Sequence, residues 1–247
     1  MKIKQHLPSI FTLINLFLGF LAIINTMAGD YVVACYIILA AGAFDSVDGK
    51  IARLIGISTN FGKEIDSLAD MVSFCLAPSI LVFSLYTQNM PGISGEIIAS
   101  APLIMGAIRL ARFNTDVGDE NSAYFTGLPT PMNALSIASL VLFIEHFKID
   151  NPEYSQPRLL LPLILSLSYL MVSRVHYAKF PLLNFNSGKQ NTFRLLGIVL
   201  FGITFIGAIF FGYPYRVLAG FMSFYLLTGI WNHLKNLGNV ETKNQET

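Results

Sequence analysis

Four aspartates interrupt otherwise apolar sequence, and their spacing is that of side chains on helix faces. Asp45 and Asp48 are three residues apart, and Asp66 and Asp70 are four apart. Residues three or four apart lie on one face of a helix. A charged side chain at the centre of a membrane helix costs roughly 2.5–3.5 kcal/mol. Four such residues in one hairpin therefore indicate a function.

We expect all four carboxylates to lie at one level of an antiparallel hairpin. Residues at equal depth in such a hairpin have numbers with a constant sum, which is 115 for Asp45 with Asp70 and 114 for Asp48 with Asp66. Small and polar residues at 56–60 predict the turn between the two helices. At about 1.5 Å per residue, the acidic layer lies roughly 10–20 Å from that turn.

Four carboxylates in one layer of low dielectric repel one another and cannot all stay ionised without cations. Divalent metal is the simplest partner. A ligand set made only of oxygen favours Mg²⁺, Mn²⁺ or Ca²⁺ over zinc. Two such ions sharing carboxylates would suit phosphoryl chemistry, because they neutralise a pyrophosphate and activate an attacking oxygen.

The residues around the acidic pairs suit a phosphate ligand. Gly49 and Gly62 leave the backbone open to a ligand, Ala52 is small, and Arg53 offers a planar fork to phosphate oxygens. The first turn of the second helix adds unpaired amides. Structural roles are open to the same residues, since both glycines would also allow close helix contacts and Arg53 would also anchor its helix at the membrane surface.

The elements that must carry these residues are membrane helices. Of the 247 residues, 53% are apolar and only 13% are charged, against about 25% charged in globular domains. A helix that crosses a bilayer needs roughly 20 apolar residues. We therefore predict an all-α, polytopic transmembrane bundle of about eight helices, at 7–28, 31–55, 62–87, 95–113, 131–147, 157–175, 193–212 and 214–234.

Basic residues predict the orientation of these helices, because Lys and Arg concentrate in cytoplasmic loops. With the N-terminus inside, thirteen basic residues fall on the cytoplasmic side and three on the other. Both termini are therefore expected in the cytoplasm, and the acidic layer opens to that side. We expect one membrane domain over 1–235, with the acidic hairpin at 31–87, and a disordered polar tail at 236–247.

Composition also bears on partners. A net charge of +1 with no block rich in Lys or Arg argues against nucleic acid. Cys35 and Cys75 lie in apolar runs, and we expect buried side chains there, not a disulfide or a metal site.

A cation carrier with intramembrane carboxylates is the alternative from a different class. The outer halves of the predicted helices are apolar, however, and lack the polar path that a carrier needs.

As a string, residues 45–70 read D-x-x-D-G-x-x-A-R-x(8)-G-x-x-x-D-x-x-x-D, which resembles the signature of the CDP-alcohol phosphatidyltransferase family at every fixed position. The resemblance implies at least six transmembrane helices around the active site, a homodimer, and Mg²⁺ or Mn²⁺, as two ions, at the carboxylates. It makes Asp70 the general base as well as a ligand. The implied metal ligands are Asp45, Asp48, Asp66 and Asp70, and the implied contacts to the CDP-lipid are Asp48, Gly49, Ala52, Arg53 and Gly62.

Three further segments look like those of the phosphatidylserine synthase branch. They are Arg-Leu-Ala-Arg-Phe-Asn at 109–114, Phe-Thr-Gly-Leu-Pro-Thr-Pro at 125–131, and Ser173-Arg174 with Tyr177 and Phe180. With the signature, the likeness extends across most of residues 10–181. It implies transfer of a phosphatidyl group from CDP-diacylglycerol to L-serine, with release of CMP, for phospholipid biosynthesis in the cytoplasmic (inner) membrane. Glycerol 3-phosphate, inositol phosphate or another alcohol stays the alternative acceptor.

Arg109 and Arg112 are the candidate cations for the carboxylate of serine or for the lipid phosphate, because they lie at the cytoplasmic end of a predicted helix. Both would also serve as anchors at the membrane surface. The Gly-Leu-Pro-Thr-Pro segment at 127–131 has two possible roles as well. It either starts the next helix, with proline in the first turn, or shapes the acceptor pocket.

Overall fold

The computed structural model describes residues 7–55, 60–115, 124–151, 160–178 and 189–245. The chain divides into two compact units, residues 1–118 with 128–173 and residues 119–127 with 174–247. The membrane domain expected over 1–235 takes in all of the first unit and most of the second. Each unit is described by itself.

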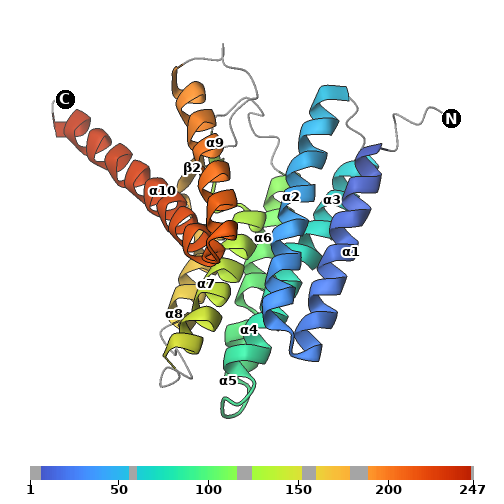
Figure 1. The fold of residues 1–247 in the computed structure, drawn as a ribbon. Helices are drawn as coiled ribbons and strands as arrows, with labels where there is room; N and C mark the ends of the chain where they lie inside the picture. Colours follow the sequence, from blue (N-terminus) through green and yellow to red (C-terminus); the bar gives the residue numbers. More distant parts are fainter. Residues whose placement is uncertain (1–6, 56–59, 116–123, 152–159, 179–188, 246–247) are drawn as a thin grey trace. The chain divides into compact units, whose positions relative to one another are not determined.

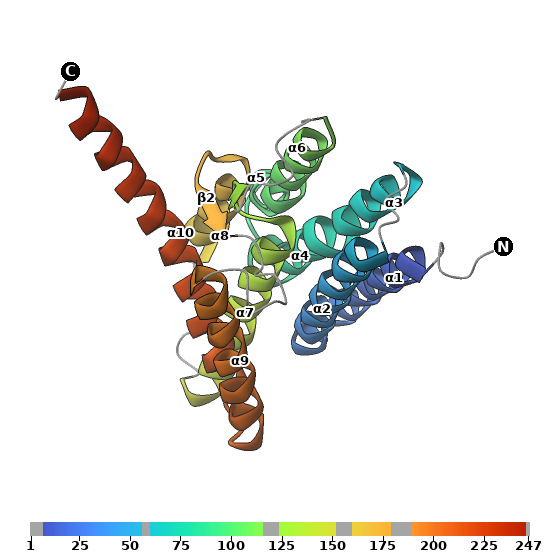
Figure 2. The ribbon, with the colours of Figure 1, turned by 90° about the horizontal axis from the view of Figure 1, so that it is seen from above.

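The first unit is helical throughout its described residues. Figure 1 and Figure 2 both show its first three helices side by side. The elements are α1 (Leu7–Ala28), α2 (Tyr31–Ile55), α3 (Asn60–Asp70), η2 (Met71–Leu76), α4 (Ala77–Val82), η3 (Phe83–Thr87), α5 (Ser94–Ala99), α6 (Ala101–Thr115), α7 (Thr130–Asp150) and α8 (Leu160–Val172).

A two-residue turn joins α1 to α2 and makes them antiparallel. Gly29 has a φ of +88°, a conformation that favours glycine. The amide of Gly29 donates to the carbonyl of Thr26 at 3.1 Å, and the amide of Asp30 donates to the carbonyl of Asn25 at 2.9 Å. These bonds satisfy the last carbonyls of α1. The chain can therefore reverse at once and lay α2 along α1.

The chain is helical without a break from Asn60 to Thr87, but two stretches of this rod, η2 and η3, are π-helical. The first begins directly after Asp70. A π-helix is wider than an α-helix and shifts the side chains that follow, and such stretches occur frequently at functional sites. The third predicted helix, 62–87, is thus confirmed in extent, but parts of it are π-helical and not α-helical.

Small residues bring α1 and α6 close to the rod. The Ser73 hydroxyl on η2 donates to the backbone carbonyl of Asn15 on α1 at 2.8 Å. A Cβ atom added at Gly19 would lie 2.7 Å from the Cα atom of Ser73, and one added at Gly106 on α6 would meet the side chain of Cys75. Cys75 is buried, and so is Cys35, as predicted.

The second unit pairs two short strands and two helices: β1 (Tyr124–Thr126), β2 (His176–Ala178), α9 (Lys189–Phe210) and α10 (Pro214–Gln245). The strands are antiparallel, with Phe125 opposite Tyr177. Tyr177 is fully buried and stacks on Tyr225 of α10 at 5.5 Å between ring centroids. Burial raises the pKa of Tyr177 to about 12, so its phenol stays neutral near pH 7.

Helices α9 and α10 lie against each other. The rings of Phe201 and Phe221 stack with centroids 4.0 Å apart. The turn between the helices contains Gly212 at a φ of +80°, where a side chain would be strained. The polar segment 236–247, for which we expected a disordered tail, is instead helical as far as Gln245. That expectation was wrong for 236–245.

All eight predicted helices exist, and the protein is a polytopic helical membrane protein. Among the described residues, five helices are long and apolar enough to cross a bilayer: Ile10–Ala28, Phe61–Thr87, Ser94–Thr115, Thr130–Ile149 and Pro214–Lys235. The other three predicted spans fall on α2, α8 and α9, which contain the apolar helical stretches Tyr31–Val47, Leu160–Val172 and Leu195–Phe210. Large apolar side chains on these helices are exposed, Phe17 and Leu68 among them, as contact with lipid requires.

Candidate active site

Three of the four predicted carboxylates meet in the first unit. Asp45 comes from α2, and Asp66 and Asp70 come from α3. One carboxylate oxygen of each residue lies within 4.8 Å of the other two. The expectation that these residues share one level is confirmed for Asp45, Asp66 and Asp70 by this grouping of their oxygens.

The fourth carboxylate, Asp48, lies on α2 one helical turn after Asp45. Its side chain falls outside what the structure describes, and the surroundings of Gly49 and the side chains of Ala52 and Arg53 on the same helix do so too. Their predicted contacts to the CDP-lipid stay predictions. Gly62 is described: it is half-buried in the first turn of α3, four residues before Asp66, and therefore lies on the same face as that carboxylate.

The three carboxylates differ in their access to solvent. Asp66 is exposed, whereas Asp45 and Asp70 are half-buried. The Oδ1 atom of Asp70 is fully buried and has no hydrogen-bond partner among the described residues. Asp70 therefore has one oxygen that the protein encloses and leaves without a hydrogen-bond donor.

A hydroxyl group holds the other oxygen of Asp70. The Oγ1 atom of Thr130, the first residue of α7, donates to Asp70 Oδ2 at 3.2 Å. Behind it, the Nη1 atom of Arg109 on α6 donates to Thr130 Oγ1 at 3.3 Å. Thr130 is fully buried. The Gly-Leu-Pro-Thr-Pro segment thus starts α7, which was one of its two possible roles. Its threonine also contacts the carboxylate of Asp70.

The two candidate arginines have different places. Arg109 contacts Thr130 and, through it, Asp70. Arg112 is exposed, and its Nη1 atom donates to the backbone carbonyl of Val172 at the end of α8, at 3.2 Å. Nearby, the amide of Asn114 donates to the hydroxyl of Ser67 at 3.0 Å, which ties the end of α6 to α3 beside Asp66. Two residues of the Arg-Leu-Ala-Arg-Phe-Asn segment therefore lie beside the carboxylates. Asn114 contacts α3 directly, and Arg109 contacts Thr130, which binds Asp70.

Two buried amides escaped the sequence analysis. Asn15 on α1 and Asn133 on α7 are fully buried, and neither side-chain amide has a hydrogen-bond partner among the described residues. Asn133 lies three residues after Thr130, on the same face of α7. Asn15 lies against Ser73, which is three residues after Asp70. Both residues are asparagines within apolar helices, and this is the signal by which the sequence could have singled them out.

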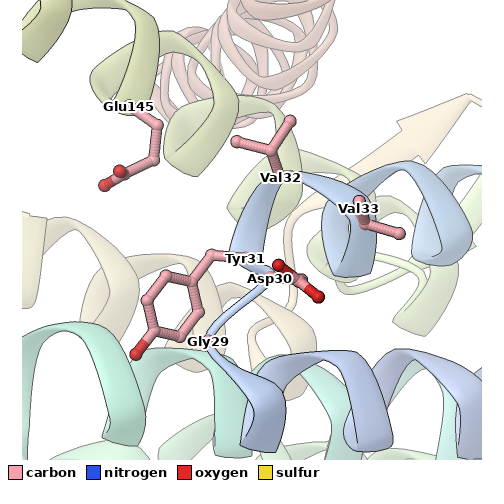
Figure 3. A pocket seen from close by; sticks show the side chains of 6 residues that line it. All are labelled: Gly29, Asp30, Tyr31, Val32, Val33 and Glu145. Carbon is pink, nitrogen blue, oxygen red and sulfur yellow. The ribbon is translucent and has the colours of Figure 1, made fainter.

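Figure 3 shows a separate hollow of about 210 Å³ in the first unit. It is lined by the turn between α1 and α2, with Asp30 and Tyr31, and by Glu145 of α7. Glu145 forms an ion pair with Lys148 at 2.6 Å. Fifteen residues of helix, roughly 22 Å, separate Glu145 from Thr130. This hollow is therefore no part of the carboxylate cluster.

A family model identifies the chemistry that this arrangement serves. The model of the CDP-alcohol phosphatidyltransferases matches residues 5–177, which include every side chain of the cluster and the arginines beside it. The chain belongs to the CDP-alcohol phosphatidyltransferase family. It is therefore an enzyme whose family signature coincides with the residues that the hairpin brings together.

Curated relatives of this phosphatidyltransferase carry names that mention serine. The chain is 34% identical over 225 residues to the CDP-diacylglycerol–serine O-phosphatidyltransferase of Helicobacter pylori strain 26695, covering 90% of this chain and 89% of the relative. The enzyme of the same name from Bacillus subtilis is 32% identical, over 76% of this chain and 99% of its own. The archaetidylserine synthase of Methanothermobacter thermautotrophicus is 35% identical, over 70% of each chain.

The carboxylates of this phosphatidyltransferase fit a divalent metal by their chemistry. All the grouped donor atoms are carboxylate oxygens, which suit Mg²⁺ and Mn²⁺. The buried, unpartnered Oδ1 atom of Asp70 is one that a cation or a hydroxyl proton would satisfy. The residues present are thus able to hold the metal that the family resemblance implies.

Proposed function

We propose that this enzyme transfers the phosphatidyl group of CDP-diacylglycerol to the hydroxyl of L-serine and releases CMP, in phospholipid biosynthesis. The observation that carries the proposal is the meeting of Asp45, Asp66 and Asp70 on two neighbouring membrane helices. Family membership supplies the class of reaction, and the names of the relatives support serine as the acceptor.

Asp45, Asp48, Asp66 and Asp70 would hold two divalent ions, Mg²⁺ or Mn²⁺. Bound there, the ions would neutralise the pyrophosphate of the CDP-lipid and favour departure of CMP. The side chains of Asp48 and Arg53, with the small residues Gly49, Ala52 and Gly62, would lie along the CDP moiety.

Asp70 would act as the general base. The hydroxyl proton of serine passes to its carboxylate while the serine oxygen forms a bond to the phosphorus that carries diacylglycerol. The bond between that phosphorus and the oxygen of CMP breaks, and CMP leaves with the electron pair. Because Oδ2 of Asp70 already accepts from Thr130, the buried Oδ1 atom is the oxygen free to take the proton. A base must lie within hydrogen-bond reach of the proton that it takes, and it contributes more by its position than by a large shift of its pKa.

Serine suits the described cations better than a phosphorylated alcohol does. A phosphomonoester carries more negative charge than a carboxylate and needs more cations around it. At this end of the first unit Arg109 contacts Thr130, whereas Arg112 is exposed. We propose Arg112 for the carboxylate of serine. Glycerol 3-phosphate and inositol phosphate remain the acceptors to compare.

The active site would open to the cytoplasm, with both termini on that side of a cytoplasmic (inner) membrane and with two copies of the chain forming a homodimer. The excess of basic residues on the predicted cytoplasmic side supports this orientation. The dimer is supported by the family resemblance alone.

An acceptor panel tests the proposal. Purified enzyme in mixed micelles would receive CDP-diacylglycerol, Mg²⁺ or Mn²⁺, and one labelled acceptor at a time: serine, glycerol 3-phosphate, inositol phosphate or inositol. We expect labelled phosphatidylserine and CMP in equal amounts. Robust product from another alcohol, with none from serine, would refute the assignment of the acceptor. A parallel series with the ether-linked archaeal CDP-lipid would define the lipid, since one relative is an archaetidylserine synthase.

A further inference from the structure

The hydrogen bonds around Thr130 have a fixed direction. A guanidinium group has only donors, so Thr130 Oγ1 must accept from Arg109 Nη1. A hydroxyl has one proton, and with its oxygen turned toward Arg109 that proton points to Asp70 Oδ2, 3.2 Å away. With Asp70 ionised, as a metal ligand must be, the order Arg109 to Thr130 to Asp70 follows from chemistry.

The backbone fixes Thr130 in this place. Thr130 is the first residue of α7, directly after Pro129, whose ring restricts the backbone. The amide of Leu128 donates to the carbonyl of Leu170 on α8 at 2.9 Å, which ties the start of α7 to a second helix. The threonine side chain is fully buried and has few rotamers because it is branched at Cβ. Its hydroxyl is thus a rigid point against which a carboxylate can be oriented.

We propose that Thr130 is a positioning residue for Asp70, and that Arg109 orients the Thr130 hydroxyl. By holding Oδ2, the hydroxyl fixes the plane of the carboxylate, so that Oδ1 keeps one orientation and stays without a protein partner. Arg109 then acts on Asp70 through Thr130, in addition to the direct attraction between its charge and that carboxylate. The inference rests on the proposed role of Asp70. Outer-shell partners of metal-ligating carboxylates typically contribute about 10-fold to 100-fold to metal affinity or activity.

Kinetics of three variants test the positioning role. Thr130→Val keeps the shape and removes the hydroxyl, and Thr130→Ser restores the hydroxyl. Thr26→Val is the matched control, because Thr26 is also buried and its hydroxyl donates to the carbonyl of Ala22 within α1. We expect Thr130→Val to lower kcat by about 10-fold to 100-fold, with the KM values for serine and CDP-lipid unchanged. Thr130→Ser should recover most of the rate, and Thr26→Val should match the wild type.

A rate for Thr130→Val equal to that of the wild type would overturn the proposal. Equal losses in Thr130→Val and Thr130→Ser would do so too, because they would show that the packing of threonine matters and its hydroxyl does not.

Metal binding gives a readout without turnover. Mn²⁺ binding to the substrate-free protein, followed by electron paramagnetic resonance, should weaken by about 10-fold in Thr130→Val and return in Thr130→Ser. Wild-type affinity in Thr130→Val would overturn the proposal even if turnover fell, because Asp70 would then be held without the hydroxyl. This measurement needs no substrate. If the wild type refused serine and every other acceptor, the proposed function would fail while Thr130 could still be judged.

A double-mutant cycle tests the part played by Arg109. Arg109→Gln alone should lower kcat, and it should cost less in the Thr130→Val background than in the wild type, since both changes break one chain of contacts. If Arg109→Gln caused its full loss in the Thr130→Val background, Arg109 would act independently of Thr130, and its assignment as the residue that orients the hydroxyl would be overturned.

Discussion

Asp45, Asp66 and Asp70 lie close enough to share a cation, although each charged group is costly in a membrane helix. Oxygen donors grouped in this way can bind a divalent cation, which offsets the cost of placing charged groups in the membrane. The spacing of these residues along the chain was enough to predict their meeting, because helix geometry links number to depth. Thr130 could not be found in this way, since it is 60 residues from Asp70. Its position depends on how α7 packs against η2, the stretch that directly follows Asp70.

The exchange of Asp70 for asparagine separates binding from turnover. Asp70→Asn keeps the size of the side chain and removes the group that takes the proton. We expect kcat to fall by at least about 100-fold, while binding of the CDP-lipid stays measurable by equilibrium dialysis of labelled substrate. A variant that turns over at the wild-type rate would show that another group is the base.

Arg112 tests the acceptor site. If its guanidinium holds the carboxylate of serine, Arg112→Ala should raise the KM for serine by about 10-fold or more, the size of a hydrogen bond to a charged group. The KM for CDP-diacylglycerol should change little. An unchanged KM for serine would leave Arg112 with the contact that the structure shows, a tie between α6 and the end of α8.

At the scale of elements, the hairpin of α2 and α3 positions the carboxylates, and α1, α6 and α7 hold it in place. Helix extents were predictable from apolar runs, but the π-helical stretch after Asp70 was not, because its hydrogen bonds depend on packing. The helical backbone at 236–245 also differed from expectation. Loss of apolar residues marks the end of a membrane span, and a polar helix can continue beyond it.

Close contact between α1 and the rod should be sensitive to one methyl group. Gly19→Ala would place its Cβ atom against the backbone of Ser73. We expect a loss of about 1–3 kcal/mol from overpacking, measured as a lower Tm in detergent. Gly202→Ala on α9 is the control, because an added Cβ atom meets nothing there. That change should be neutral or stabilise the protein by up to about 1 kcal/mol. Equal Tm values for the two variants would contradict the described contact.

At the scale of the molecule, exposed apolar side chains on helices of sufficient length make this a membrane protein with several spans. The membrane class followed from composition, and the number and place of the helices followed from the apolar runs along the chain. The side of the membrane on which each end lies rests on the distribution of basic residues, which is why the orientation needs its own test.

Labelling from outside intact cells tests the orientation. Cys35 and Cys75 are buried, so a membrane-impermeant maleimide should react weakly with the parent protein. Ile93 and Lys235 are exposed at opposite predicted sides. We expect Ile93→Cys to be labelled in intact cells and Lys235→Cys only after the cells are opened. The reverse pattern would place the termini outside.

The proposed chemistry requires divalent metal at the carboxylates of α2 and α3, and removal of metal tests this requirement most directly. Phosphatidylserine synthesis by purified enzyme would be measured in chelator and again during titration with Mg²⁺ or Mn²⁺, for the wild type and for Asp66→Asn. We expect no product in chelator, saturable recovery in the wild type, and recovery in Asp66→Asn only at higher metal concentrations. Synthesis that continues at the full rate without metal would contradict the account.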